Sequence, residues 1–300
     1  MVPTLVLVSL LVFLVFQQLA DPAVLDLNSN ATPEQIARHR HKLGLDQSLP
    51  ARAWQELRAL FSLDFGTSRY HQQAVAPLIA RSLPVTLLYA LPGFIGATAL
   101  SIATALFCAR HEGQRIDRIL QFLSTALVSC SSLLIVIAVH TGLTHLVPLF
   151  PISWPLGASD RWLELRSLVL PSFLWVLLQF GPDLRHYRSL FIQDLKQAHF
   201  DALRARGLPE SVVLKHQLRA IAAPLCARIG HLFPHVFAGS VVIEYMFNIP
   251  GVGALLVDAI QGVDLPLMQA ITFVLTVSTL FAQLSAEIAA GLLDPRMRRW

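Results

Sequence analysis

Residues 82–109 read SLPVTLLYALPGFIGATALSIATALFCA and contain no Asp, Glu, Lys or Arg. As an α-helix, which rises about 1.5 Å per residue, this stretch is longer than the ~30 Å hydrocarbon core of a bilayer. An uncharged run of this length is typical of a transmembrane helix and not of a helix that packs one face on a soluble core. The stretch therefore predicts an integral membrane protein.

The composition of the rest of the chain agrees with this class. Of 300 residues, 54% are hydrophobic and 14% are charged, whereas an ordinary soluble domain is about 25% charged. The three cysteines all lie in apolar stretches, which excludes a secreted disulfide scaffold. The net charge of +4 comes without a run of Lys and Arg, so we attribute it to membrane orientation and expect no nucleic-acid binding.

Further apolar stretches lie on both sides of residues 82–109. The N-terminal one has no basic residues before it, so we interpret it as a retained span and not as a signal peptide. The fifth stretch requires that Arg228 is tolerated near its start. The predicted fold is an all-α integral membrane protein with six transmembrane helices in a single domain, at about 2–20, 84–109, 119–147, 168–187, 221–243 and 265–290.

The distribution of Arg and Lys over the loops predicts the orientation. Loops 110–118 and 185–219 and the C-terminal tail carry several Arg and Lys residues, whereas loop 245–264 carries none. Short cytoplasmic loops hold the excess of Lys and Arg, so both termini are expected in the cytoplasm. The first loop, 21–81, is basic but long enough to cross the membrane regardless of its charge, and we place it outside.

The external loop 21–81 is expected to be partly helical. Thr32 or Asn30 can cap a helix that begins near Pro33, and residues 53–63 have apolar side chains at helical spacing. An external segment of this size is either a solvated cap or a docking surface for an external partner.

The cytoplasmic loop 188–220 has the pattern of two short helices with a bend between them. Apolar residues recur at three- and four-residue steps from Leu190 to Ala202, and the pattern stops at Gly207 and Pro209. Glycine suits such a bend because it accepts a positive φ and lets another backbone approach closely. Periodicity alone is equally compatible with an ordinary amphipathic helix at the membrane surface.

The residues before the bend resemble a known motif. Asp201-Ala202-Leu203, followed after three residues by Gly207, is similar to the EAA motif of binding-protein-dependent ABC transporter permeases. Asp201 stands where that motif usually has glutamate, and Leu203 stands where it has a second alanine. The resemblance implies that Asp201, Ala202, Leu203 and Gly207 couple this chain to an ATPase subunit.

Other segments, in order along the chain, resemble the permease family for dipeptides, oligopeptides and nickel. They are Ala20-Asp21-Pro22-Ala23, Leu43-Gly44-Leu45-Asp46, Leu63-Asp64-Phe65-Gly66-Thr67-Ser68, Arg81-Ser82-Leu83-Pro84, Arg204-Ala205-Arg206-Gly207-Leu208, Ile243-Glu244-Tyr245-Met246-Phe247 with Pro250-Gly251-Val252-Gly253, and Asp294-Pro295-Arg296. Each match is weak alone, but their order and spacing make the set specific.

The resemblance implies the transmembrane-domain fold of a type I ABC importer in the bacterial inner membrane. It implies that this chain forms half of a pore for peptides or similar small solutes. The implied partners are a second homologous permease subunit, two cytosolic ABC ATPase subunits, an external solute-binding protein and membrane lipid. No Walker motif Gly-x-x-x-x-Gly-Lys-[Ser/Thr] occurs here, so ATP and Mg²⁺ are expected on the ATPase subunits, and we expect no catalytic residue, cofactor or metal in this chain.

The break after the fifth span is the candidate for a gate. Pro250-Gly251-Val252-Gly253 interrupts the helix, and non-helical backbone at membrane depth is tolerated where protein buries it or where it lines a cavity. We therefore interpret 244–264 as a re-entrant or outer-face element near the translocation path, with Glu244, Pro250, Gly251 and Gly253 as candidate gate residues. Glu244 either faces the path or bonds to the local turn.

Two histidines keep other functions open. His231 and His235 are four residues apart and share one helix face, which would suit a haem or metal site, although contacts with the pore or a neighbouring helix explain them as well. The alternatives to an ABC permease are thus a haem- or metal-binding membrane protein and a secondary transporter. A secondary transporter would need broken helices in two related halves, which we do not find.

Overall fold

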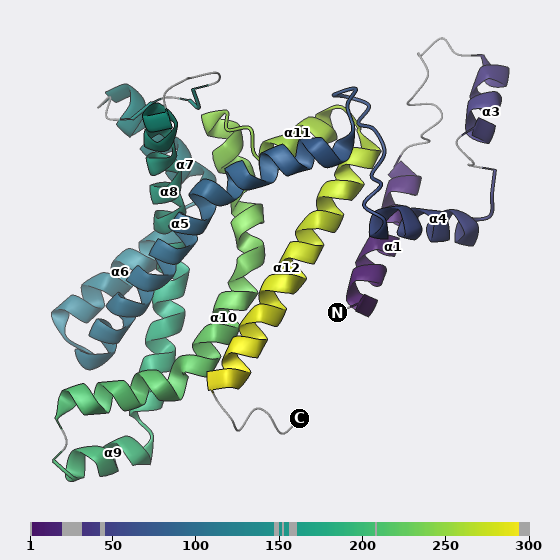
Figure 1. The fold of residues 1–300 in the computed structure, drawn as a ribbon. Helices are drawn as coiled ribbons and strands as arrows, with labels where there is room; N and C mark the ends of the chain where they lie inside the picture. The colour runs from purple at the N-terminus through teal and green to yellow at the C-terminus, as the bar shows by residue number, and fades with distance from the viewer. Residues whose placement is uncertain are drawn as a thin grey trace. The chain divides into compact units, whose positions relative to one another are not determined.

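The computed structural model describes residues 2–19, 32–42, 46–146, 150–151, 153–155, 161–207 and 209–293. Over these residues the chain is helical, apart from turns and one isolated β-bridge between Thr67 and Ala74 (Figure 1). The helices are α1 (Val2–Leu19), α3 (Pro33–Lys42), α4 (Leu49–Phe61), α5 (Val75–Arg110), α6 (Arg115–Ser129), α7 (Ser132–Thr141), a π-helix η1 (Gly142–Leu146), α8 (Arg161–Leu195), α9 (Ala198–Ala205), α10 (Glu210–Phe247), α11 (Val252–Gln261) and α12 (Leu265–Leu293). The prediction of an all-helical protein is confirmed.

Four helices in the described part of the chain are long and apolar enough to cross a membrane. They are α5, α8 from Leu165, α10 from Val212, and α12. The pair α6 and α7 passes the same test as one broken span, which would make five. The N-terminal stretch is the 18-residue helix α1, in which Pro3–Val12 counts as a shorter apolar helix. The sixth span therefore remains a prediction.

Two segments differ from the simplest form of the predicted spans. The stretch 119–147, expected as one span, is split into α6 and α7, which are bent by 98°. The backbone is extended at Cys130 and Ser131, with ψ of 140° and 130°. Neighbouring serines favour such a break because their side chains compete for backbone hydrogen bonds. The second difference concerns the fifth predicted span, 221–243. α10 already starts at Glu210 and runs through this span, so the helix begins within the loop expected over 188–220.

The external loop contains the helices that the sequence predicts. α3 starts at Pro33, directly after Thr32, whose backbone N–H donates to Gln35 Oε1 at 2.9 Å. α4 covers the expected helix near 53–63 but starts earlier, at Leu49, because Pro50 is well tolerated in a first helical turn. The expected motif segments at 20–23, 43–45 and 294–296, and Leu208, lie outside the described residues.

The chain forms two compact units, Met1–Thr86 with Pro250–Leu280 (unit 1) and Leu87–Ile249 with Phe281–Trp300 (unit 2). The core of unit 1 is built by the start of α5, by α11 and by the start of α12. Its fully or nearly fully buried members are Val75, Ile79, Val252, Leu255, Ala259, Leu267, Ala270 and Ile271. A buried aspartate, Asp264, joins the loop before α5 to this core: it accepts hydrogen bonds from Ser68 Oγ at 2.5 Å and Tyr70 N at 3.0 Å.

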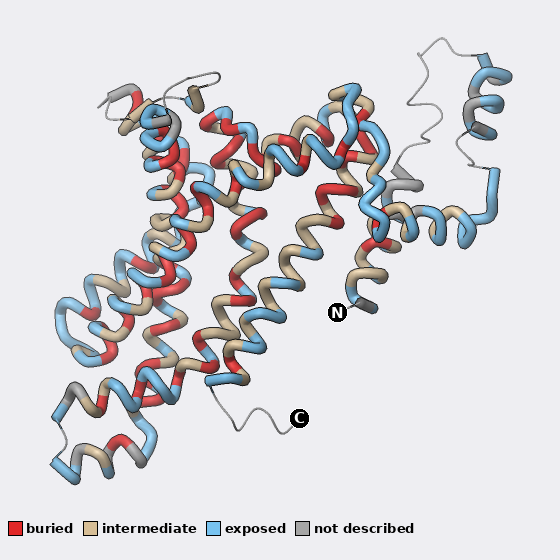
Figure 2. Tube along the Cα trace, viewed as in Figure 1, coloured by how far each residue is buried: buried red, intermediate tan, exposed pale blue. Residues whose placement is uncertain are grey.

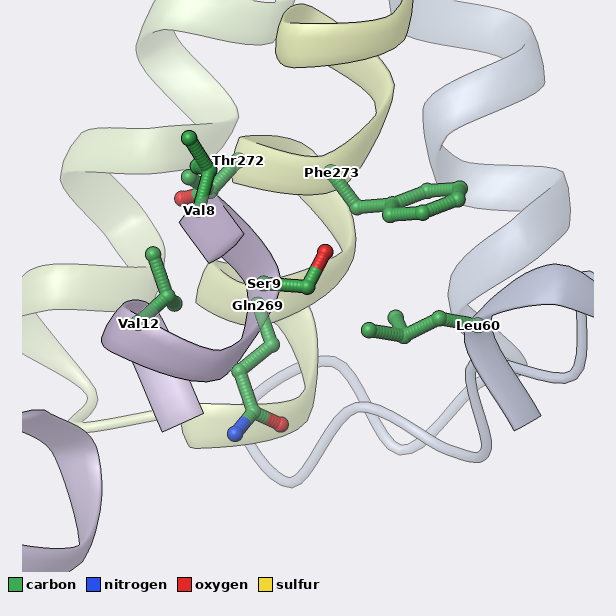
Figure 3. A pocket seen from close by; sticks show the side chains of 7 residues that line it. All are labelled: Val8, Ser9, Val12, Leu60, Gln269, Thr272 and Phe273. Atoms are coloured by element: carbon green, nitrogen blue, oxygen red, sulfur yellow. The ribbon is translucent and has the colours of Figure 1, made fainter. Parts of the chain in front are cut away.

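Helix α1 packs within unit 1. Figure 3 shows side chains of α1, α4 and α12 around a small cavity of about 10 Å³. Its lining residues are Val8, Ser9, Val12, Leu60, Gln269, Thr272 and Phe273. Ser9 is 8% exposed and Leu60 is 6% exposed, so α1 contributes to the packing of unit 1.

Unit 2 is organised around α8, which contacts α6, α7 and α10. Figure 2 shows buried residues recurring along α8 and α10. The core cluster comes from the end of α5, from α8 and from α10, and contains Ala105, Cys108, Ala109, Leu184, Tyr187, Phe191, Ile192, Ile221 and Leu225. This cluster lies directly beside the segment that carries α9.

Candidate functional site

The predicted coupling segment is a short helix followed by a glycine turn. α8 ends at Leu195, α9 runs from Ala198 to Ala205, and α10 starts at Glu210. Gly207 has φ of +71°, the left-handed conformation that the sequence argument assigned to it. Asp201, Ala202 and Leu203 lie on α9. Ala202 and Gly207 are exposed, so these two small residues are open to a partner.

Buried contacts hold this segment on the membrane-spanning helices. Phe200 of α9 is fully buried. Gln217 of α10 is 1% exposed, and its Nε2 donates to the carbonyl oxygen of Phe191 on α8 at 3.1 Å. Figure 1 shows that the first part of α10 lies beside α9 and makes a wide angle with the rest of the helix. Pro224 and Pro234 lie inside α10 and each removes a backbone donor, which is the usual cause of such a bend.

An ion pair next to this segment was not anticipated from the sequence. Arg188 on α8 donates to Asp117 on α6 through Nε to Oδ1 and Nη2 to Oδ2, each at 2.7 Å. The Asp117 side chain is 1% exposed, and it also accepts the backbone N–H of Gly113 at 3.0 Å. A carboxylate at the third helical position that accepts a backbone N–H of the preceding turn caps the helix. The position of Asp117 at the start of the helix was therefore the sequence feature that could have predicted this capping bond. The pair fixes the α5–α6 turn to the end of α8.

A second acidic residue lies inside a candidate span. The Asp183 side chain on α8 is fully buried and stands 4.0 Å from Arg228 Nη2 on α10. Its Oδ1 also accepts Gln179 Nε2 at 3.2 Å. Arg228 was noted in the predicted fifth span, whereas its acidic neighbour was not anticipated, although Asp183 lies within the predicted span 168–187.

The histidines of α10 are not gathered with other ligands. His231 and His235 are both exposed in this chain. Among the described residues, no three or more His, Cys, Asp or Glu side chains come close enough to hold a metal ion.

The predicted gate residues fall in different compact units. In unit 2, Glu244 is fully buried and accepts a hydrogen bond from Tyr89 Oη at 3.0 Å. α10 ends soon after, at Phe247, and the next residue, Asn248, has a left-handed φ of 53°. In unit 1, Gly251 precedes α11, and the backbone N–H of Val252 donates to Thr86 Oγ1 at 2.8 Å.

The element after this break is helical but short. α11 has 10 residues, about half of what a bilayer crossing needs. Pro250 is exposed, whereas Gly251 and Gly253 are buried. A short helix of this kind agrees with the expected re-entrant or outer-face element, and its place in a translocation path stays a prediction.

Taken together, long apolar helices interrupted by a helix–glycine–helix segment define a multi-span membrane transport component. The chain belongs to the family described as binding-protein-dependent transport system inner membrane component: the family's sequence model matches residues 101–299, and the model of its N-terminal part matches residues 1–90. It is accordingly a permease subunit of an ABC importer of the bacterial inner membrane.

Relatives match over nearly the full length of the chain. A protein of Brucella abortus (strain 2308) assigned to a peptide transport system as its permease is 32% identical, over 99% of this chain and 96% of its own. The dipeptide transport system permease protein DppB of Lactococcus lactis subsp. cremoris is 33% identical, over 98% and 95%. The glutathione transport system permease protein GsiC of Salmonella choleraesuis is 30% identical, over 99% and 96%.

Proposed function

We propose that this chain forms half of the translocation pore of an importer for peptides or similar small solutes. The observation that carries the proposal is the α9–Gly207 turn, an exposed helix and a left-handed glycine held by buried contacts to the candidate spans. The names of the relatives support the substrate class, since peptides, dipeptides and glutathione share the peptide bond.

The proposed topology has six spans with both termini in the cytoplasm. α1 is the first span; its packing against α4 and α12 supports a retained helix, because a cleaved signal peptide would not contribute to the folded core (Figure 3). The bent pair α6 and α7 is the third span. On this topology the single permease domain covers 1–300, with loop 21–81 outside and loop 188–220 in the cytoplasm.

Coupling in this proposal works through α9 as a lever. Asp201, Ala202, Leu203 and Gly207 contact an ATPase subunit, which holds the ATP and Mg²⁺. When two ATPase subunits close, α9 moves with them. The buried Phe200 and the bond from Gln217 to Phe191 then transfer that movement to α8 and α10, and alternating access to the pore follows.

At the outer side, Glu244 is the gate candidate in unit 2, and Pro250, Gly251 and Gly253 are the gate candidates in unit 1. A buried carboxylate in a membrane helix is costly unless it meets water or a partner. Tyr89 supplies one partner in this chain. A second homologous permease subunit completes the pore, and the helices α3 and α4 of the external loop receive the solute-binding protein.

The test is transport by the assembled complex. The chain is purified with its co-purifying subunits, reconstituted in liposomes with its binding protein, and assayed for ATP-dependent uptake of labelled dipeptide and of glutathione. Uptake of at least one, lost when Gly207 is changed to Val while the complex still forms, supports both the substrate class and the coupling role. Uptake that does not depend on ATP, or on this residue, would contradict the proposal.

A further inference from the structure

Three helix ends of unit 2 surround a cavity of about 380 Å³. The end of α5, the last residue of α8 and the start of α10 contribute its walls, which are made by Ala109, Arg110, His111, Leu195, Val213, Leu214 and Gln217. The cavity is lined by the start of α10 and by the residues directly before the turn between α5 and α6. Of its lining residues, only Gln217 takes part in the coupling contacts proposed above.

One wall of the cavity carries a cationic side chain, Arg110. Arg110 is exposed and forms no ion pair with any residue that the structure describes. His111 Nδ1 donates to the carbonyl oxygen of Phe107 at 2.9 Å, which holds its ring against the end of α5. A wall of this kind suits a phosphate group, to which arginine can offer two parallel donors.

The nearby acidic side chains do not cancel this charge. Glu112 pairs with Lys196, with 3.2 Å between Oε1 and Nζ. Asp117 is occupied by Arg188. Asp194 is 6% exposed, and its Oδ1 accepts Gln197 Nε2 at 3.3 Å. Among the residues that the structure describes, none of these acidic side chains pairs with Arg110.

Another part of the cavity wall is apolar. Leu195, Val213 and Leu214 face the same space as Arg110, and they belong to helices long and apolar enough to cross a membrane. An acidic side chain of a protein partner would satisfy the cationic wall but would leave this wall without an apolar partner. A phospholipid offers both, because its phosphate is followed by a glycerol ester and acyl chains.

We propose that this cavity binds the headgroup of an anionic phospholipid. Arg110 contacts the phosphodiester, and Leu195, Val213 and Leu214 contact the glycerol and the first methylenes. The inference rests on the proposed topology in one respect, the side of the membrane on which the cavity lies. On that topology the loops 110–118 and 188–220 lie at the cytoplasmic leaflet, which is anionic. A lipid here would brace the α5–α6 turn against the start of α10, beside the coupling helix.

The test measures lipid retention by the intact transporter. The complex, with its ATPase subunits, is placed in nanodiscs of phosphatidylcholine with or without phosphatidylglycerol, and native mass spectrometry then counts the phosphatidylglycerol that stays bound after delipidation. Arg110→Gln is expected to raise the phosphatidylglycerol concentration needed for half retention about fivefold, the usual effect of one basic residue at an anionic surface. Leu214→Trp, which fills the apolar wall, should lower retention without changing any charge.

Arg115→Gln is the matched control. Arg115 is an exposed arginine of the same turn that does not line the cavity, so its loss should leave retention unchanged. Equal loss in both arginine variants, or no preference for phosphatidylglycerol over phosphatidylcholine, overturns the proposal. Full displacement by millimolar inorganic phosphate would identify a free-anion site instead. Loss of ATPase subunits from Arg110→Gln with lipid retention intact would assign the cavity to the ATPase.

Discussion

Arg188 binds Asp117 with two parallel hydrogen bonds of 2.7 Å, and this pair ties the last turns of α8 to the first turn of α6. The arginine lies shortly before α9 in the chain, and the aspartate lies directly after the α5–α6 turn. Any displacement of the end of α8 is therefore passed to α5 and α6 through a rigid, two-bond contact, and not through packing alone.

The first prediction concerns this pair. Arg188→Gln leaves a buried carboxylate without its cation, and breaking a buried ion pair in this way costs about 3–5 kcal/mol. The melting temperature of the purified complex in detergent should fall markedly. Lys196→Gln is the control, because the Lys196–Glu112 pair spans the same turn but its side chains are 66% and 46% exposed. Such a pair contributes about 1 kcal/mol at most, so equal losses in the two variants would contradict a stabilising role for Arg188.

The second prediction concerns the turn after α9. A Cβ at Gly207 would have no atom of this chain within 4 Å, so a side chain here would not clash. Its free-energy cost would come from the left-handed backbone, which has a φ of +71°. Gly207→Val should be strained by about 1–2 kcal/mol, whereas Gly207→Asn should be tolerated, since asparagine visits this region. Uptake and ATP hydrolysis by the assembled transporter are the measurements. If Asn also abolishes coupling while the fold is kept, the partner itself requires a residue without a side chain.

The third prediction separates the two roles of Glu244. Glu244→Leu leaves the Tyr89 hydroxyl without this acceptor, at a cost of about 1–3 kcal/mol, and should lower the melting temperature in detergent. Glu244→Gln can still accept the bond and should fold normally. If Glu244 faces the path, Gln changes transport rate or substrate preference. Normal transport by Glu244→Gln together with a destabilised Glu244→Leu would make this residue a structural clasp.

The fourth prediction concerns close packing between α5 and α8. A Cβ on Gly93 would lie 2.7 Å from Trp175 Cβ and 3.0 Å from the carbonyl oxygen of Ser172. Gly93→Ala should therefore destabilise unit 2 by about 1–3 kcal/mol, the usual cost of overpacking. At Gly96 the nearest atom, Val176 Cγ2, is 3.4 Å away, so Gly96→Ala should be neutral or stabilising because alanine is the better helix former. The reverse order of melting temperatures would contradict this packing.

The fifth prediction is the topology. A cysteine at Gln73 should react with an impermeant thiol reagent added outside intact cells, and one at Gln197 should react only after the membrane is opened. Gln73 is preferred to its neighbour Gln72, which has a positive φ of 53° and would be strained by substitution. The background needs Cys130→Ser, because Cys130 is exposed. Labelling in the opposite order would exclude the proposed orientation.

The sequence by itself determined the class of protein and the main helices. A helix that faces lipid must be long and largely uncharged. Residues 82–109 and 265–286 contain no Asp, Glu, Lys or Arg, and α5 and α12 lie where these stretches predict them. The turn at Gly207 was also predictable, because the helical pattern stops at a glycine, whose ability to adopt a positive φ is a local property of the residue. The helices α3 and α4 followed from capping and spacing for the same reason.

Only the tertiary structure decided what depends on residues far apart in the chain. α6 and α7 come from one largely apolar stretch and are bent by 98° relative to each other. The amino-acid composition of the stretch does not predict this bend. Arg188 and Asp117, Asp183 and Arg228, and Tyr89 and Glu244 are partners because helices pack side by side. A local pattern shows that a charge is present, but the free energy of burying it depends on which opposite charge or donor the fold brings within reach.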